Sequence, residues 1–143
     1  MSKILIIDDE RGIRNTLKEI LADEGHEVEV AENGKQGLEM AQAKAYDLIF
    51  SDIKMPEMDG MEVLKALKQP HPTSPQGEET DPIGASIVMI SGHGDVETAV
   101  QALKAGAYDF LVKPLDLNRI LITTKNALES KNLRQETKQL RKK

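Results

Sequence analysis

Short apolar runs that each end in a polar residue constrain this chain more than any other feature. Four runs of three or four apolar residues lead into the pair Asp8 and Asp9, into Asp52 after one intervening serine, and into Ser91 and Lys113. Such runs suit strands that are buried on both faces of a parallel sheet. The strands of a parallel sheet all end at one edge, so we expect these polar residues to meet there.

Helical periodicity fills the stretches between the runs, and Gly25 and Gly106 follow two of these stretches as C-terminal caps do. Strands are predicted at 3–7, 27–31, 47–51, 86–91 and 109–112, and a fifth helix from about residue 117 onward. This alternation predicts an α/β protein. The expected fold is a flavodoxin-like three-layer sandwich, with a five-stranded parallel sheet in the order 2-1-3-4-5 and five helices.

Composition narrows the function classes. The chain has 143 residues, a net charge of -5, two Tyr, two Phe and no Trp, so it lacks the basic and aromatic surface of a nucleic-acid-binding protein. It contains no Cys, which fits a reducing compartment. The first residues do not resemble a signal peptide, and no apolar run approaches the length of a membrane span. We expect a cytoplasmic chain that binds neither nucleic acid nor membrane directly.

One stretch, residues 69–85, interrupts the pattern. It holds four of the six prolines, two glycines and three acidic residues, so neither helix nor strand is expected there. We predict an insertion loop that enters the fourth strand at its amino end, on the side opposite the polar edge. A solvated insertion is the simpler interpretation, and a loop that docks a partner is the alternative.

The polar edge has the composition of a Mg²⁺ site. Mg²⁺ prefers oxygen ligands, and Asp9 and Asp52 supply carboxylates. Acidic residues near a helix start can instead serve as caps. Capping does not explain Asp52, which follows a different strand, and acids gathered at one edge repel each other unless a cation lies between them.

The same edge can carry phosphoryl chemistry. The carboxylate of Asp52 can attack phosphorus and form an aspartyl phosphate. The ammonium of Lys113 and the hydroxyl of Ser91 can then stabilise the phosphoryl oxygens. Taken singly, Ser91 could be a turn cap and Lys113 a solvated charge, but their joint position at strand ends favours the phosphoryl site.

Four motifs resemble those of one family. They are Ile6-Ile7-Asp8-Asp9-Glu10, Ser51-Asp52-Ile53-Lys54-Met55-Pro56-Glu57-Met58-Asp59-Gly60, Ile90-Ser91-Gly92-His93-Gly94 and Gly106-Ala107-Tyr108-Asp109-Phe110-Leu111-Val112-Lys113-Pro114. They span nearly the whole chain in the family's order. The chain resembles the receiver domain of two-component response regulators, and in detail the receivers of sigma-54-dependent activators of the nitrogen-regulation class.

This resemblance implies a role for each site residue. Asp52 would be the phosphoacceptor, and Lys113 would pair with the phosphoryl group and precede a cis peptide bond to Pro114. Asp8, Asp9, Asp52 and the backbone carbonyl of Lys54 would hold Mg²⁺.

The resemblance also implies a switch. Ser91 would bond the phosphoryl group, and Phe110 would move from exposed to buried. Phe110 stands where a tyrosine is often found, so a plain core aromatic is the alternative interpretation. Long side chains at Lys54 and His93 suggest slow hydrolysis of the phosphoaspartate.

Partners and boundaries follow from the same resemblance. Residues 1–126 would form the receiver, and 127–143 an extended last helix that starts a linker to output domains absent from this chain. A sensor histidine kinase would supply the phosphoryl group, and the chain would not be an enzyme with turnover. A homodimer would form through the fourth helix, fifth strand and fifth helix. Leu133 and Leu140, one heptad apart, hint at a coiled coil, and a solvated helix is equally compatible.

Three other classes share part of this pattern. A dehalogenase-like phosphatase needs a second carboxylate two residues after its nucleophile, where this chain has Lys54. A flavodoxin binds phosphate in a loop without acids, whereas three acids follow the first strand here. A receiver-like interaction module that is not phosphorylated remains the main alternative, although it would not need the full set of acids, hydroxyl and lysine.

Overall fold

The computed structural model describes residues 2–55, 58–68, 85–92 and 96–141, with side chains up to residue 129. Its five strands are β1 (Lys3–Ile7), β2 (Glu27–Ala31), β3 (Leu48–Asp52), β4 (Ser86–Ser91) and β5 (Asp109–Val112). They pair in parallel in the order β2-β1-β3-β4-β5. The predicted order is therefore confirmed.

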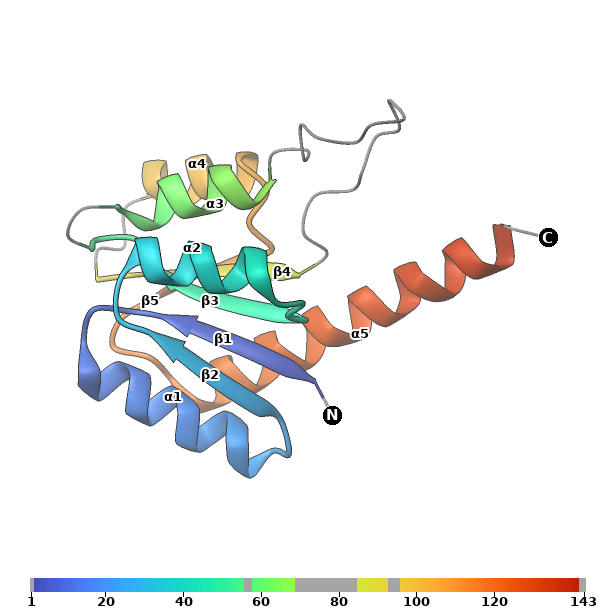
Figure 1. Cartoon of the computed structure of the whole chain (residues 1–143), viewed down its shortest axis with the longest axis horizontal. Helices are drawn as coiled ribbons and strands as arrows, with labels where there is room; N and C mark the ends of the chain where they lie inside the picture. Colours follow the sequence, from blue (N-terminus) through green and yellow to red (C-terminus); the bar gives the residue numbers. More distant parts are fainter. Residues whose placement is uncertain (1, 56–57, 69–84, 93–95, 142–143) are drawn as a thin grey trace.

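Helices cover both faces of this sheet, as predicted for a three-layer sandwich (Figure 1). One face packs α1 and α5, and the other packs α2, α3 and α4. The helices are α1 (Arg11–Asp23), α2 (Gly34–Ala43), α3 (Gly60–Lys68), α4 (Val96–Lys104) and α5 (Leu117–Arg141).

Alternate residues of the central strands fill two separate cores. Ile4 and Ile6 of β1 point to the core beneath α1 and α5, whereas Leu5 and Ile7 point to the core beneath α2, α3 and α4. All four side chains are fully buried. A strand buried on both faces needs a continuous apolar run, which is why these runs dominate the sequence.

The third strand differs from its prediction by one residue at each end. It was expected at 47–51 and lies at Leu48–Asp52. Asp47 instead fixes the start of β1, because its carboxylate accepts the Lys3 N–H at 2.9 Å and its own N–H donates to the Lys3 carbonyl at 2.8 Å. Asp52 remains in the ladder opposite Ile90 and is the last residue of the strand.

Two glycines end helices as predicted. Gly25 has φ +90° and Gly106 has φ +111°, both in the left-handed region that favours glycine. After α1 the His26 N–H donates to the Leu21 carbonyl at 3.2 Å, and after α4 the Ala107 N–H donates to the Ala102 carbonyl at 3.0 Å. These are Schellman caps, which satisfy the last helical carbonyls and turn the chain back toward the sheet.

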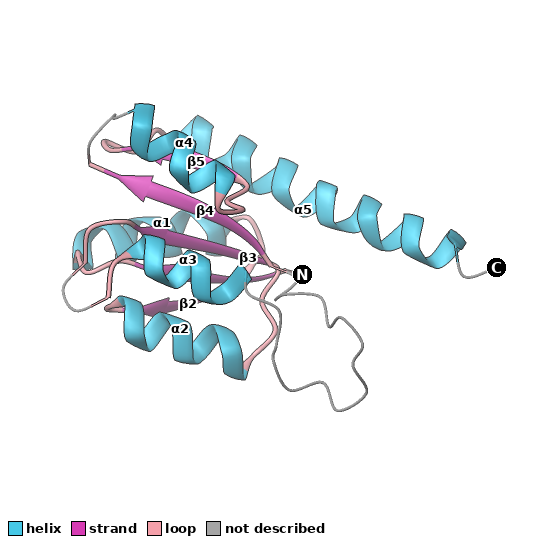
Figure 2. Cartoon of the chain, turned by 90° about the horizontal axis from the view of Figure 1, so that it is seen from above, coloured by secondary structure: helices cyan, strands magenta, loops and turns pink. Residues whose placement is uncertain are grey.

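The long last helix runs well past the end of the sheet (Figure 2). Ile120 and Ala127 anchor its first half in the core beneath α1 and α5. Within the parts of the chain that the structure describes, no helix combines the length and the apolar character needed to cross a membrane. The insertion predicted at 69–85 lies outside the described residues except for Ala85, which is buried just before β4.

Gly60, the first residue of α3, lets the loop after β3 fold back onto its own strand. A Cβ at this position would overlap the backbone carbonyl oxygen of Asp52, and the Gly60 N–H donates to the Ile53 carbonyl at 2.8 Å. The backbone cannot retreat without disturbing Asp52 itself. A glycine is therefore required beside the polar edge.

We expect Gly60→Ala to lower the free energy of unfolding by about 1–3 kcal/mol, the usual range for overpacking a tight site. Gly12 is the matched control, because a Cβ there has nothing within 4 Å. Gly12→Ala lies in α1 and should raise the free energy of unfolding by about 0.5–1 kcal/mol. Urea denaturation of both variants checks this, and equal effects would contradict the close approach at Gly60.

Candidate functional site

The sheet ladder brings the polar strand ends to one edge. Ile7 is paired with Ser51, so Asp8 and Asp52 follow neighbouring positions of β1 and β3. The Lys113 N–H donates to the Ser91 carbonyl at 2.8 Å, which extends the pairing of β4 and β5 by one residue. The backbone itself therefore gathers these four residues, as the sequence predicted.

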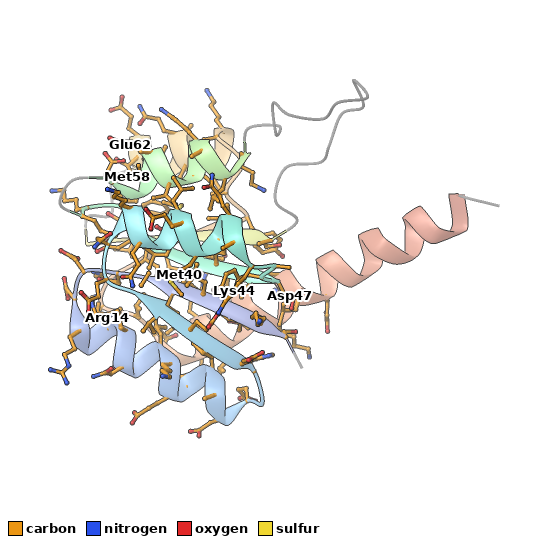
Figure 3. The ribbon with its side chains drawn as sticks, in the orientation of Figure 1. Arg14, Met40, Lys44, Asp47, Met58 and Glu62 are labelled. Carbon is orange, nitrogen blue, oxygen red and sulfur yellow. The ribbon has the colours of Figure 1, made fainter. Side chains whose placement is uncertain are left out.

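Figure 3 shows the two opposite edges. Arg14 of α1 and Met58, in the loop after β3, lie at the edge where the strands end, and Asp47 lies at the other edge. The guanidinium of Arg14 donates to the backbone carbonyl of Asp8 at 2.8 Å. This contact ties the start of α1 to the end of β1 and helps to fix the position of Asp8.

The ammonium of Lys113 is shared among three carboxylates. Its Nζ lies 3.2 Å from Oδ2 of Asp52 and 3.3 Å from Oε1 of Glu10. Oδ2 of Asp8 is slightly farther from Nζ, at 3.6 Å. The Lys113 side chain is only 15% exposed and Asp8 and Asp52 are buried, so water screens these two attractions weakly, whereas the Glu10 side chain is 60% exposed and its attraction is screened more.

Burial makes the two central carboxylates costly to ionise. Asp8 is 1% exposed and Asp52 is 3% exposed. Burial is the main cause that raises the pKa of Asp8 to about 6; the Asp52 charge adds to the rise, and the Glu10 backbone N–H and Lys113 oppose it. Burial also raises the pKa of Asp52. The charge of Asp9 adds to this rise, and Lys113 opposes it.

The lysine responds in the complementary way. Burial lowers the pKa of the Lys113 ammonium, but the attraction of Asp8 and Asp52 outweighs burial, and the net pKa is raised. Lys113 is therefore held as a cation at neutral pH. Its single positive charge does not fully neutralise the acids around it. A second cation at this edge would lower the repulsion among the acids.

The acids after β1 fit a hard divalent cation. Oxygens of Asp8, Asp9 and Glu10 all lie within 4.8 Å of one another. Oδ2 of Asp8 is buried and accepts no hydrogen bond from any described residue. An orphaned carboxylate oxygen among other carboxylates is the donor set that Mg²⁺ prefers. The residues present thus fit the predicted ion.

Comparison with known proteins identifies the family. Residues 4–125 match the family model described as the response regulator receiver domain. The chain belongs to the response regulator receiver domain family. The predicted family is therefore confirmed.

Its relatives include the nitrogen assimilation regulatory protein NtrX of Azorhizobium caulinodans, 41% identical over 96% of this chain and 28% of the relative. The transcriptional regulatory protein ZraR of Klebsiella oxytoca is 38% identical over 87% of this chain and 26% of its own length. These names agree with the predicted class of nitrogen-regulation and transcriptional regulators. The receiver domain spans less than a third of each of these relatives.

Solved structures support the same assignment. A crystal structure of NtrX from Brucella abortus covers 99% of this chain and 30% of its own, with a TM-score of 0.83 and 38% identity. The structure of the NtrX receiver domain from the same organism covers 88% of this chain and 98% of its own, with a TM-score of 0.74. The flavodoxin-like arrangement of this receiver domain is therefore confirmed.

Glu10 is the site residue that the sequence analysis did not single out. It is the N-cap of α1, yet its side chain makes no capping hydrogen bond and instead pairs with Lys113. Asp8 is also not a usual helix cap, since its Oδ1 accepts the Glu10 N–H at 2.8 Å, ahead of the first helical residue. The capping alternative therefore does not account for these acids. The sequence signal that could have found Glu10 was its place as the third acid in the run 8–10.

The remaining predicted residues lie around this centre. Ser91 is 4% exposed at the end of β4, and the Lys54 side chain is exposed in the loop after β3. Phe110 is partly buried and packs against the core beneath α2, α3 and α4. The Lys113–Pro114 peptide bond is cis, as the family resemblance implied. His93 lies outside the described residues.

The raised pKa of Asp8 predicts a pH dependence of stability. In the folded state Asp8 binds its proton up to about pH 6, whereas an unfolded Asp releases it near pH 4. Stability from this group is therefore present below about pH 4 and is lost as the pH rises to about 6. Asp8→Asn should be more stable than the wild type at pH 7 by about 3 kcal/mol, since each pKa unit corresponds to about 1.4 kcal/mol.

Urea denaturation between pH 4 and pH 7.5, with a chelator to remove divalent ions, measures this difference. Asp23→Asn is the control, since Asp23 is an exposed residue of α1 far from the acids, and its curve should follow that of the wild type. A difference between Asp8→Asn and the wild type that does not change with pH would refute the raised pKa.

Proposed function

We propose that this receiver domain accepts a phosphoryl group on Asp52 and so switches the output of a two-component response regulator. The observation that carries the proposal is the position of Asp52. Its carboxylate is 3% exposed at the end of the central strand β3, and Lys113 lies 3.2 Å from its Oδ2. A buried carboxylate beside a fixed cation is a positioned nucleophile for phosphorus.

The transfer needs little from the protein beyond position and charge. A carboxylate oxygen of Asp52 attacks phosphorus, and the bond from phosphorus to the donor nitrogen or oxygen breaks as the donor leaves with the electron pair. Lys113, already held as a cation by its neighbours, neutralises the transferred phosphoryl oxygens. The hydroxyl of Ser91, which follows the position opposite Asp52 in the ladder, would donate to one of those oxygens.

Mg²⁺ would be held by Asp8, Asp9, Asp52 and the backbone carbonyl of Lys54. When bound, the ion would neutralise charge on the phosphoryl oxygens and on the acids around it. Two features support this assignment: Oδ2 of Asp8 is buried without a hydrogen-bond partner, and burial raises the pKa of Asp8 although Lys113 lies nearby, so the site can take up further positive charge. Glu10 would orient Lys113 from the outer side of the cluster.

A sensor histidine kinase would supply the phosphoryl group, in the cytoplasm. The chain would carry out one transfer to its own aspartate and then lose the phosphate slowly by hydrolysis. It therefore has no turnover in the usual sense of an enzyme. The long side chain of Lys54 beside the site would slow the approach of water, and a phosphoaspartate lifetime of seconds would contradict this.

The conformational switch would couple Ser91 to Phe110. Phosphorylation adds charge next to Ser91, and the hydrogen bond to the phosphoryl oxygen would draw the β4–α4 loop inward. Phe110 is paired with Met89 and already packs partly into the core, so its further burial would report the inward state.

Exposed apolar side chains mark the surface that would dimerise. Val96, Val100 and Leu103 recur at helical spacing along α4 and are 76%, 42% and 48% exposed, and Val112 of β5 is 43% exposed. Ile122 of α5 is also exposed, at 58%. Exposed apolar residues gathered on adjacent elements are typical of protein interfaces. The linker and a transcription-activator output would follow the long α5.

Intact-mass measurement tests the phosphoacceptor. After incubation with acetyl phosphate and Mg²⁺, the wild type should gain the mass of one phosphoryl group and Asp52→Asn should gain none. Removal of Mg²⁺ by a chelator should abolish the gain. Asp23→Asn is the control, because it makes the same change at an exposed residue of α1 outside the site, and it should be phosphorylated like the wild type.

The outcomes separate two functions. If Asp52→Asn still gains the mass of a phosphoryl group, the phosphoacceptor is a residue other than Asp52. No gain in the wild type, together with no Mg²⁺ binding by calorimetry, would favour a receiver-like interaction module that works without phosphate. No gain with Mg²⁺ binding intact would restrict the donor to the cognate kinase, and the measurement would be repeated with a phosphorylated histidine kinase domain.

Val100→Asp tests the dimer surface. A carboxylate placed in this apolar stripe should weaken phosphate-dependent dimerisation about tenfold or more, equivalent to about 1.4 kcal/mol. Phosphate incorporation should not change. Sedimentation equilibrium with and without acetyl phosphate measures the effect. Thr16→Asp on the exposed side of α1 is the control and should dimerise like the wild type.

A further inference from the structure

Helix α2 begins with a glycine that lies against the loop after β3. Gly34 is the first residue of α2 and is buried. A Cβ built on Gly34 would overlap the backbone carbonyl oxygen of Met58 and would lie only 3.1 Å from Cγ2 of Val63. Figure 3 shows Met58 beside the start of α2. The helix therefore touches the loop through its backbone, with no side chain of its own between them.

Two hydrogen bonds fix the start of α2. Oδ1 of Asn33 accepts the Gln36 N–H at 2.8 Å, and Oε1 of Gln36 accepts the Glu32 N–H at 2.8 Å. This reciprocal cap ties the first turn of the helix to the chain that leaves β2. The start of α2 is thus a fixed support for the loop that carries Met58.

The loop transmits this contact to the phosphoacceptor. Two residues after Met58, Gly60 lies against the backbone carbonyl of Asp52. The Gly60 N–H donates to the carbonyl of Ile53, the residue before Lys54, at 2.8 Å. These contacts are made by backbone atoms, which cannot yield by changing a rotamer. A shift of Met58 would therefore reach the backbone of Asp52.

A second glycine of α2 has a different neighbour. Gly37 lies one turn after Gly34 and is also buried. A Cβ on Gly37 would overlap the side chain of Ile7, which supplies all three of its nearest atoms. A side chain can change its rotamer, whereas a carbonyl oxygen moves only with its backbone. The two glycines therefore allow crowding of the core to be separated from displacement of the loop.

We propose that Gly34 is a positioning residue of the phosphoryl site, which sets the place of the Asp52 backbone through the loop after β3. The inference rests on the proposed function of Asp52 and adds to it a residue from another element. A larger residue at position 34 would displace the loop, and with it the Asp52 carboxylate and the Lys54 carbonyl. Because Mg²⁺ demands near-ideal octahedral geometry, displaced ligands would bind it more weakly.

Gly34→Ala and Gly37→Ala make the same change one turn apart and test the proposal on the full chain. Both should unfold at lower urea concentrations than the wild type, because each overpacks a buried site. Mg²⁺ titrations of the folded proteins, followed by backbone amide signals in NMR, should separate them. Gly34→Ala should bind Mg²⁺ at least about tenfold more weakly, the usual loss when a group that holds a metal ligand in place is changed. Gly37→Ala should bind it like the wild type.

The metal-free proteins give a readout that needs neither Mg²⁺ nor phosphate. In Gly34→Ala the amide signals of Asp52, Ile53 and Gly60 should shift, because the displaced loop moves these backbone groups. In Gly37→Ala the largest shifts should instead lie around Ile7.

Two further variants separate a displaced loop from an unstable fold. Gly12→Ala, where an added Cβ has nothing within 4 Å, provides a stabilised background for Gly34→Ala. A protein that is merely unstable would regain wild-type affinity for Mg²⁺ there, whereas a displaced loop would not. Asn33→Ala loosens the start of α2 without adding volume, and it should weaken Mg²⁺ binding by less than Gly34→Ala does.

Several results would overturn the proposal. One is equal affinity for Mg²⁺ in Gly34→Ala and Gly37→Ala, and another is wild-type affinity in Asn33→Ala. Recovery of the affinity in the Gly12→Ala background would leave Gly34 with a structural role only. If the wild type itself binds no Mg²⁺, the proposed function fails. The amide shifts of metal-free Gly34→Ala then still decide whether Gly34 positions Asp52, and unshifted Asp52 and Gly60 signals would refute it.

Discussion

The ammonium of Lys113 holds together an edge of the sheet that would otherwise repel itself. Asp8, Asp52 and Glu10 all lie within 3.6 Å of its Nζ. Asp52 is 61 residues away in the sequence and Glu10 is 103 residues away, so the ion pairs form only when β1, β3 and β5 are in register. The parallel ladder and this charge cluster therefore stabilise each other.

This dependence explains why the edge is suited to a switch. Burial, with repulsion from neighbouring acids added, raises the pKa values of Asp8 and Asp52, and one lysine relieves this cost only in part. Any added charge, whether a metal ion or a phosphoryl group, changes the partner of Lys113 and the repulsion among the acids. A small chemical event can thus shift the balance between two arrangements of the surrounding loops.

Much of the fold could be predicted because strands buried on both faces leave a strong signal. The apolar runs ending at Ile7 and Ile90 predicted the central strands, and Gly25 and Gly106 predicted two helix ends. The one-residue shift of β3 could not be foreseen, because Asp47 and Asp52 are both polar residues next to the same run. The local hydrogen bonds of Asp47 with Lys3 decide the boundary.

The sequence predicted which residues form most of the candidate site, but it did not predict which of their side chains pair. Strand ends gave Asp8, Asp52, Ser91 and Lys113, but the pairing of Glu10 with Lys113 depends on side-chain directions that spacing alone does not fix. Oγ1 of Thr124 is buried without a hydrogen-bond partner among the described residues, whereas Oγ1 of the adjacent Thr123 donates to Asp109, and this difference was also beyond prediction. Whether a buried hydroxyl is paired is decided by neighbours far away in the sequence, and two adjacent threonines on one helix differ in this respect.

Because α5 is one continuous helix, a small tilt near the sheet moves its far end by a larger distance. Among the residues of α5 whose side chains the structure describes, Ala127 is the last that is fully buried, and the helix continues to Arg141, about 21 Å farther at the usual rise per residue. A tilt of about 5° at Ala127 would displace the far end by about 2 Å, since a helix bends little over such a length. Small rearrangements around β5 and the start of α5 would therefore produce larger displacements at the far end of α5, well outside the sheet.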